Sequence, residues 1–136
     1  MDKAHTRRVV VTEAATAVIE TLKKEHGPLM FHQSGGCCDG SSPMCYPEGD
    51  LMLDDSDIWL GRISGCDFYI SKDQFEYWKH TQLKVDVVPG RGSSFSLEIP
   101  MGVRFLIRSR LYTEAESEAL SPTYPATQKP TDLPVE

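Results

Sequence analysis

The sequence predicts one α+β domain that is rich in β-structure, with one longer helix near the N-terminus and one short helix near the middle of the chain. Three observations support this prediction. Residues 13–26 repeat apolar side chains at the spacing of one helical face. Short β-type runs, several with two-residue alternation, fill much of residues 29–34, 51–70 and 83–107. The length of 136 residues, with 40% hydrophobic and 25% charged residues, is typical of a single soluble domain.

The first helix has clear start and stop signals. Residues 9–11 are three valines and predict a short opening strand. Thr12 is a good N-cap, and Glu13 is favourably placed at the positive end of the helix. Gly27 and Pro28 end the helix, because glycine accepts a left-handed conformation and proline cannot continue the helix. The buried helical face is expected to contain Ala15, Val18, Ile19 and Leu22.

A strand is predicted over residues 29–34, directly before a loop rich in glycine and cysteine. His32 shares one face of this strand with Met30 and Ser34, because side chains alternate between the two faces. Residues 51–70 contain further β-type runs separated by turn signals. These runs suggest a meander.

A second, shorter helix is predicted after residue 70. Ser71 and Gln74 fit a capping box, in which each side chain satisfies a free backbone N–H of the other residue. This helix would run through Trp78. Two-residue alternation then predicts further strands up to residue 107. Their shared faces are Leu83, Val85 and Val87; Phe95, Leu97 and Ile99; and Val103, Phe105 and Ile107.

The apolar alternation stops beyond Leu111. We therefore expect residues 1–112 to form the single domain and residues 113–136 to form a poorly ordered, acidic, proline-rich tail. The formal net charge is −6; five carboxylates against one lysine give the tail −4 and leave −2 on the body. The basic stripe with interleaved aromatic residues that is typical of nucleic-acid binders does not occur, so we expect no nucleic-acid partner.

The cysteines have to be interpreted together with the cellular compartment. No apolar stretch is long enough for a signal peptide or a membrane span, so the protein is expected to be cytoplasmic and to have no membrane partner. Structural disulfides are uncommon in a reducing cytoplasm. The four cysteines are therefore expected to serve in metal binding, in redox chemistry or as buried apolar groups.

Three of the four cysteines lie within residues 35–45, together with one methionine and three glycines. Thiolates are soft ligands for zinc, copper(I) or iron–sulfur clusters, and glycines let backbone amides approach the sulfurs. The candidate metal ligands are Cys37, Cys38 and Cys45, with His32 as the nearest fourth ligand. Other candidates for the fourth ligand are Asp39, Cys66, His80 or a side chain of a second subunit.

Other interpretations of this loop stay open, because its cysteine spacing matches none of the common zinc patterns. The loop could be a strained turn with buried thiols, or Cys37 and Cys38 could form a vicinal disulfide. In a thiol-based enzyme or redox partner, Cys37 or Cys38 would be the nucleophile and His32 the base. Cys66 is expected in the core. A ligand-binding module would use Phe75, Tyr77 and Trp78, which are otherwise expected to pack the second helix.

Three segments stand out as motifs: GPLMFHQSGGCCDGSSPMC at residues 27–45, QFEYW at residues 74–78 and VVPGRG at residues 87–92. They resemble an uncharacterised bacterial family, of the DUF779 type, that is known only as a domain of unknown function. The genes of this family tend to lie beside aldehyde dehydrogenase genes. The resemblance therefore implies an accessory role in alcohol or aldehyde metabolism, with an aldehyde dehydrogenase as a partner.

The opening strand, Thr12, the first helix and the loop around Cys37 also resemble the HesB-like A-type iron–sulfur carriers. This resemblance implies a HesB-like mixed β-rich fold and a homodimer. The carriers hold their cluster with a loop cysteine and a C-terminal Cys-Gly-Cys, whereas this chain has no cysteine after Cys66. The difference favours a single ion over a cluster. Zinc is the expected metal, with copper or an iron–sulfur cluster as the alternatives. The resulting prediction is a metal-binding accessory protein rather than an enzyme.

Overall fold

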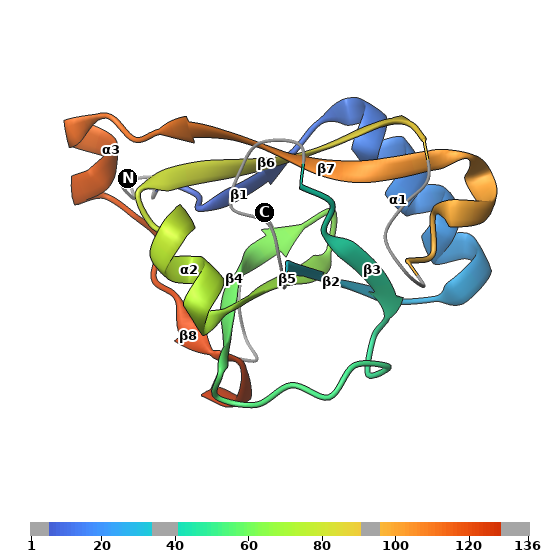
Figure 1. Cartoon of the computed structure of the whole chain (residues 1–136), viewed down its shortest axis with the longest axis horizontal. Helices are drawn as coiled ribbons and strands as arrows, with labels where there is room; N and C mark the ends of the chain where they lie inside the picture. Colours follow the sequence, from blue (N-terminus) through green and yellow to red (C-terminus); the bar gives the residue numbers. More distant parts are fainter. Residues whose placement is uncertain (1–5, 34–40, 91–95, 129–136) are drawn as a thin grey trace, which may run out of the picture.

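The computed structural model describes residues 6–33, 41–90 and 96–128, which form two β-sheets and three α-helices (Figure 1). Most of the regular structure is strand, so the prediction of a mixed, β-rich α+β fold is confirmed. The elements in chain order are β1 (Val9–Val11), α1 (Glu13–His26), β2 (Leu29–Gln33), β3 (Met44–Pro47), β4 (Asp57–Ile63), β5 (Cys66–Ser71), α2 (Lys72–Trp78), β6 (Thr81–Pro89), the 3₁₀ turn η1 (Ile99–Met101), β7 (Val103–Leu111), α3 (Glu114–Glu118), β8 (Tyr124–Pro125) and the 3₁₀ turn η2 (Ala126–Gln128).

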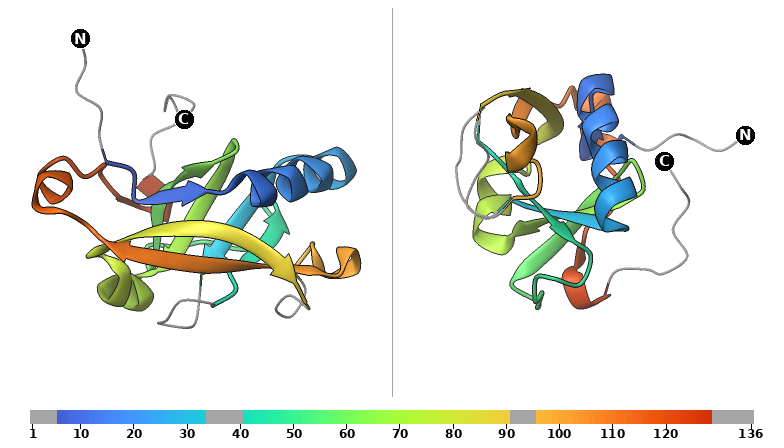
Figure 2. Two further views of the ribbon diagram at one scale, coloured as in Figure 1. Left: turned by 90° about the horizontal axis from the view of Figure 1, so that it is seen from above. Right: turned by 90° about the vertical axis from the view of Figure 1, so that its right-hand side faces the viewer.

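Helix α1 begins and ends at the predicted signals. The Thr12 side chain accepts a hydrogen bond from the backbone N–H of Ala15 at 3.1 Å. Gly27 has a φ of 79° and donates its N–H to the carbonyl of Lys23 at 2.8 Å. The helix has 14 residues, against 7 in α2 and 5 in α3. In Figures 1 and 2, α1 and α2 lie towards opposite ends of the molecule.

The two sheets combine parallel and antiparallel pairs. The first sheet has the strand order β1-β6-β7 and the second has the order β3-β2-β5-β4-β8. Strands β4 and β5 form an antiparallel hairpin, the unit from which a meander is built. Its turn residues Ser64 and Gly65 both have positive φ, as is common in two-residue hairpin turns. However, β5 pairs in parallel with β2, and β1 pairs in parallel with β6. These two parallel pairs were not predicted.

The hydrophobic core lies between the two sheets and is covered by α1. Phe31 of β2 is its centre: the Phe31 ring stacks on Phe68 at 6.1 Å and meets Phe105 of the other sheet edge-on at 5.1 Å, measured between ring centroids. The sheets also approach closely at Gly61 of β4, where an added Cβ would lie 3.0 Å from Cγ1 of Val9. Burial of apolar area between the sheets therefore drives the fold.

The second sheet also has a smaller apolar cluster on the face that points away from this core. Met30, Trp59 and Tyr69 are buried there, although they lie on three different strands. The chain segments that cover them contribute Tyr46, Leu51, Leu53, Tyr124 and Ala126. This outer face also holds His32, so it is the face on which the candidate site is built.

Two sequence expectations differ from the structure. The described residues around Leu97 form no strand: Glu98 is fully buried, and Pro100 lies in the 3₁₀ turn η1. The predicted alternation was wrong here because a buried carboxylate occupies the position between two apolar residues. Residues 113–128, expected to be a poorly ordered tail, contain α3 with a capping box and β8 paired with β4. The remaining tail residues lie outside the described ranges.

Candidate functional site

Among the predicted site residues, His32 is the one whose strand, burial and neighbours the structure describes in most detail. It is the fourth residue of β2, and its exposed fraction is only 7%. Its neighbours across the sheet are Met44 on β3 and Tyr69 on β5. Directly paired residues point to the same face of a sheet, so His32 shares the outer face with both. His32 lies one residue before the end of β2 and three residues before Gly35, where the glycine–cysteine loop begins.

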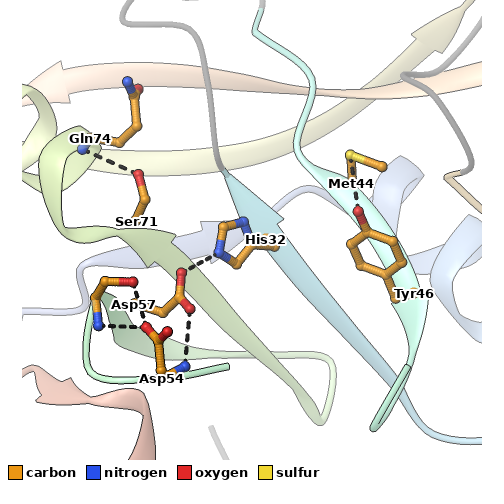
Figure 3. A network of polar contacts seen from close by, with 8 residues as sticks. His32, Met44, Tyr46, Asp54, Asp57, Ser71 and Gln74 are labelled. Carbon is orange, nitrogen blue, oxygen red and sulfur yellow. Dashed lines mark hydrogen bonds and ion pairs between the residues drawn. The ribbon is translucent and has the colours of Figure 1, made fainter. Parts of the chain in front are cut away.

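The imidazole of His32 is paired with a carboxylate. Its Nε2 lies 2.7 Å from Oδ1 of Asp57, and the side-chain exposures of the two residues are 8% and 13% (Figure 3). Strand β5 lies between β2 and β4; its Tyr69 pairs with His32 and its Ser71 pairs with Asp57. The two side chains therefore meet diagonally across β5, on one face of the sheet.

A tight turn fixes the position of Asp57. The backbone N–H of Asp54 donates to Oδ2 of Asp57 at 3.3 Å, which leaves Oδ1 for His32. The Asp54 carboxylate in turn accepts a hydrogen bond from the backbone N–H of Ser56 at 2.8 Å. The hydrogen bond from the Ser56 hydroxyl holds the pKa of Asp54 below its usual range. The hydrogen bonds of this turn thus hold the Asp57 carboxylate in position.

The pair has a defined chemical capacity. When Nε2 of a neutral imidazole donates to a carboxylate, the lone pair of Nδ1 is available for a metal ion or a proton. The other ring nitrogen of His32 points away from Asp57 (Figure 3). The same arrangement occurs in metal sites, where the carboxylate orients a ligand, and in hydrolytic sites, where it orients a general base.

A thioether lies next to His32 on the same face. Met44 is the direct partner of His32, and its sulfur accepts a hydrogen bond from the hydroxyl of Tyr46 at 3.2 Å (Figure 3). Burial raises the pKa of the Tyr46 hydroxyl, and the nearby Asp50 raises it further. Imidazole and thioether together are soft to intermediate ligands.

Cys45, a predicted metal ligand, lies on the opposite face of the sheet. It was expected in the loop, but it belongs to β3 and pairs with Phe31. Its exposed fraction is 0%, and it belongs to the main core. Burial strongly raises the pKa of the Cys45 thiol, with smaller contributions from Glu98 and Cys66. The structure therefore does not bring Cys45 and His32 together.

The two other predicted ligands, Cys37 and Cys38, lie outside the described residues, as does Asp39. The chain on either side of residues 34–40 is well fixed. Before it, β2 ends at Gln33, which is fully buried. After it, the carbonyl of Ser41 accepts a hydrogen bond from the N–H of Ile107 at 2.8 Å. Gln33 thus belongs to the second sheet, and Ser41 is hydrogen-bonded to β7 of the first sheet.

Two of the alternative fourth ligands, Cys66 and His80, lie in the described part of the chain. Cys66 is buried in the core, as predicted, and its thiol donates to the carbonyl of Ser64 at 3.7 Å. His80 is exposed, after the end of α2. Across residues 6–33, 41–90 and 96–128, no group of three or more histidine, cysteine, aspartate or glutamate side chains is arranged to hold a metal ion.

Sequence reasoning missed Asp57, which completes the candidate site. It was part of a predicted β-type run and carried no motif. Its partner His32 lies 25 residues earlier in the chain. Only the parallel pairing of β2 with β5 brings the two together, and that pairing was not predicted. The acidic turn before β4 was the one available signal.

Comparison with known protein families gives one match. The family model described as "Domain of unknown function (DUF779)" matches residues 18–111. The chain belongs to the DUF779 family. The match runs from the middle of α1 to the end of β7, so the DUF779 domain includes His32, Asp57 and the whole glycine–cysteine loop. No curated protein matches this DUF779 chain.

The described helices of this DUF779 domain were also considered as membrane spans. None of them is both long enough and apolar enough to cross a membrane.

Proposed function

We propose that this DUF779 protein is an accessory protein that binds a metal through Cys37, Cys38 and His32. Zinc is the first choice, and copper or an iron–sulfur cluster are the alternatives. One observation carries the proposal. His32 is buried, is oriented by Asp57 at 2.7 Å, and lies at the end of the strand that leads into the glycine–cysteine loop.

The Asp57–His32 pair is the arrangement expected of a metal ligand with its outer support. Metal-binding histidines commonly donate their second ring N–H to a carboxylate, which fixes the ring and raises its basicity. A carboxylate itself held by a turn, as Asp57 is by Asp54, restricts the ring further.

The loop cysteines are within chain reach of His32. Cys37 follows Gln33 by four residues, so it lies at most about 14 Å from it along an extended chain. Cys38 precedes Ser41 by three residues, so the distance between Cys38 and Ser41 is at most about 11 Å along an extended chain. These chain lengths are compatible with the proposal that the two thiols and His32 share one ion.

The proposed ligand set leaves Cys45 in the core. Its side chain would have to cross to the other face of β3 to join His32, and its buried thiol resists ionisation. Met44 already lies on the correct face and is a second candidate ligand, which would favour copper(I) over zinc. A second subunit could supply further thiolates, and this fits the proposal of a homodimer.

The wider role rests on family resemblance. We place the protein in the cytoplasm, in support of an aldehyde dehydrogenase, and relate its fold to the HesB-like carriers. A tagged chain that retains a co-expressed aldehyde dehydrogenase, and a His32→Gln variant that releases it, would support the partner. Size-exclusion chromatography with light scattering would test the homodimer.

The experiment for metal binding uses thiol reactivity. Chelation should expose Cys37 and Cys38 to alkylation in the folded protein, because a bound metal protects its thiolates. Peptide mapping would report each cysteine separately, and the core thiol of Cys66 serves as the internal control. Alkylation rates of Cys37 and Cys38 that are unchanged by chelation would contradict the proposal.

A second candidate function is favoured by the same Asp57–His32 pair. In a thiol-based enzyme or redox partner, His32 would take the proton from Cys37 or Cys38, and Asp57 would orient the ring. This function predicts that, without any metal, His32→Gln slows alkylation of one loop cysteine near neutral pH. The metal proposal predicts that His32→Gln speeds alkylation, because the protecting ion is lost.

A further inference from the structure

A row of paired side chains crosses the outer face of the second sheet, from the candidate site to β8. The register pairs His32 on β2 with Tyr69 on β5. Tyr69 also pairs with Trp59 on β4, and Trp59 pairs with Tyr124 on β8. Directly paired residues share a face of the sheet, with Cβ atoms about 5 Å apart. Three aromatic side chains therefore lie in line with His32, and Tyr124 is at the far end of the row.

Strand β8 is part of residues 119–128, a segment that we call the strap. It follows α3 and runs from the start of β1 to β4 (Figure 1). At its first end, the N–H of Thr6 donates to the carbonyl of Ala119 at 2.8 Å, and the N–H of Ser121 donates to the carbonyl of Thr6 at 2.9 Å. Nε of Arg8 donates to the carbonyl of Ser121 at 2.7 Å. This end of the strap is thus bonded to the chain just before β1.

The other end of the strap lies on β4. Strand β8 pairs with β4 over only two residues. The ring of Tyr124 lies 5.9 Å from the ring of Trp59, measured between centroids, and Ala126 packs against the same apolar cluster. The hydroxyl of Thr127 donates to the carboxylate of Asp55. A few contacts of this end therefore cover the buried Trp59.

The strap is held less firmly than the apolar cluster that it covers. Every residue of the strap is partly or fully exposed, whereas Met30, Trp59 and Tyr69 in the cluster are buried. Pro122 and Pro125 have no N–H to donate to a neighbouring strand. Segments with little buried area open at a lower free energy than core strands. The strap is therefore expected to open before the two sheets do.

The strap also lies outside the matched family domain. The match ends at Leu111, whereas the row from His32 to Trp59 lies inside it. A face of the DUF779 domain is thus covered by a segment that follows the domain. We propose that the strap is a lid, which opens as a unit while both sheets stay folded and so uncovers the aromatic end of the row that leads to His32. This device does not depend on what His32 binds, so its test is independent of the metal-binding proposal.

The test is native-state hydrogen exchange of the full, ¹⁵N-labelled chain, followed by NMR at urea concentrations below the unfolding transition. The reporters of the strap are the backbone N–H groups of Thr6 and Ser121 and the indole N–H of Trp59, which donates to Asp67 at 2.9 Å. The reporters of the core are the backbone N–H groups that pair β6 with β7. The strap reporters should exchange through one opening, about 100-fold or more above the core and with little dependence on urea.

Two variants loosen the strap at its β4 end. Tyr124→Ala removes the ring on Trp59 and should speed exchange of every strap reporter by about tenfold or more, with the core reporters unchanged. Thr127→Val removes the bond to Asp55 and should speed the same reporters by about fivefold. The matched control, Thr123→Val, makes the same chemical change within the strap but keeps both of these contacts. Its strap reporters should exchange within about twofold of the native rate.

The response of Ser121 decides whether the strap moves as a unit, because Ser121 lies at the end away from both substitutions. The proposal is overturned if the strap reporters exchange only together with the core. It is also overturned if Thr6 and Ser121 open without the Trp59 indole, or if Tyr124→Ala and Thr127→Val leave the exchange of Ser121 unchanged.

Discussion

At the scale of single residues, the His32–Asp57 pair shows what a sequence can and cannot indicate. The alternation of β2 correctly placed His32 on the face of Met30, because strand geometry alone fixes that. Asp57 could not be found, since its contact with His32 depends on which strands become neighbours. Cys45 could not be assigned either, because a cysteine at the second position of β3 and one at the end of a loop look the same in sequence.

Asp57→Asn tests whether the carboxylate orients His32 as a metal ligand. The amide keeps the size of the side chain but removes the charge. We expect metal affinity to fall by about 10–100-fold, with an unchanged fold. Competition with a fluorescent chelator would measure the affinity. Asp55→Asn offers a matched control, because it makes the same charge change in the same turn at an exposed carboxylate that is bonded to Thr127 and not to the His32–Asp57 pair. Equal losses in both variants would contradict a specific role for Asp57.

The buried thiol of Cys45 predicts a loss of stability at alkaline pH. Burial raises its pKa in the folded protein, whereas the unfolded thiol ionises near its ordinary value of about 8.5. The stabilising contribution is therefore fully present below about pH 8.5 and declines above it, by up to about 1.4 kcal/mol per pH unit. Urea denaturation from pH 7 to 10.5 under reducing conditions would measure it. A Cys45→Ala variant should show a shallower decline, and parallel curves for the two proteins would refute this account.

At the scale of elements, local signals predicted the helices well and the strands partly. Thr12, Gly27 and Ser71 act within one turn, so their sequence context is sufficient. For α2 only half of the capping box forms: Ser71 accepts from the N–H of Gln74 at 3.3 Å, while Oε1 of Gln74 is buried without a partner among the described residues.

The segment before η1 shows why the strand prediction failed. Ser96 accepts a hydrogen bond from the N–H of Cys45 at 2.8 Å and donates to Glu98, whose other oxygen accepts from the N–H of Phe105 at 3.3 Å. Two polar side chains thus bind the edges of β3 and β7 from inside the core. Alternation of apolar residues carries no sign of such contacts.

Thr12→Ala tests the start of α1. The side chain caps the helix and also donates to Oδ1 of Asp86 on β6 at 2.9 Å. We expect the free energy of unfolding to fall by about 1–2 kcal/mol, and Thr12→Ser to keep most of it. Thr21→Ala, an exposed change within the same helix, should cost nothing because alanine favours helix. Chemical denaturation would measure all three, and an equal loss in the Thr21 variant would argue against the cap.

At the scale of the whole molecule, both sheets share one core, and the family match covers all of their strands except β1 and β8. The sequence predicted this class of fold because composition and periodicity fix how much strand and helix forms. It did not predict the two-sheet arrangement, since the parallel pairs β1–β6 and β2–β5 join segments far apart in the chain. Strand order of this kind is decided by packing between distant residues.

Phe31→Ala tests the shared core. Phe31 contacts Phe68 within its own sheet and Phe105 in the other, so the cavity affects both. We expect a loss of about 3–5 kcal/mol in the free energy of unfolding and a single transition. Tryptophan fluorescence, from Trp59 and Trp78, and far-ultraviolet circular dichroism should report the same midpoint. Two separate midpoints in the native protein would show that the sheets unfold independently.

The central claim is that the loop cysteines and His32 hold a metal ion. The most direct measurement is elemental analysis, with an absorption spectrum, of tag-free protein purified without oxygen. We expect close to one metal ion per chain in the native protein, its loss in Cys37→Ser and His32→Gln, and its retention in Cys45→Ala and Cys66→Ala. A native protein without stoichiometric metal, or variants at Cys37 and His32 that keep it, would contradict the claim.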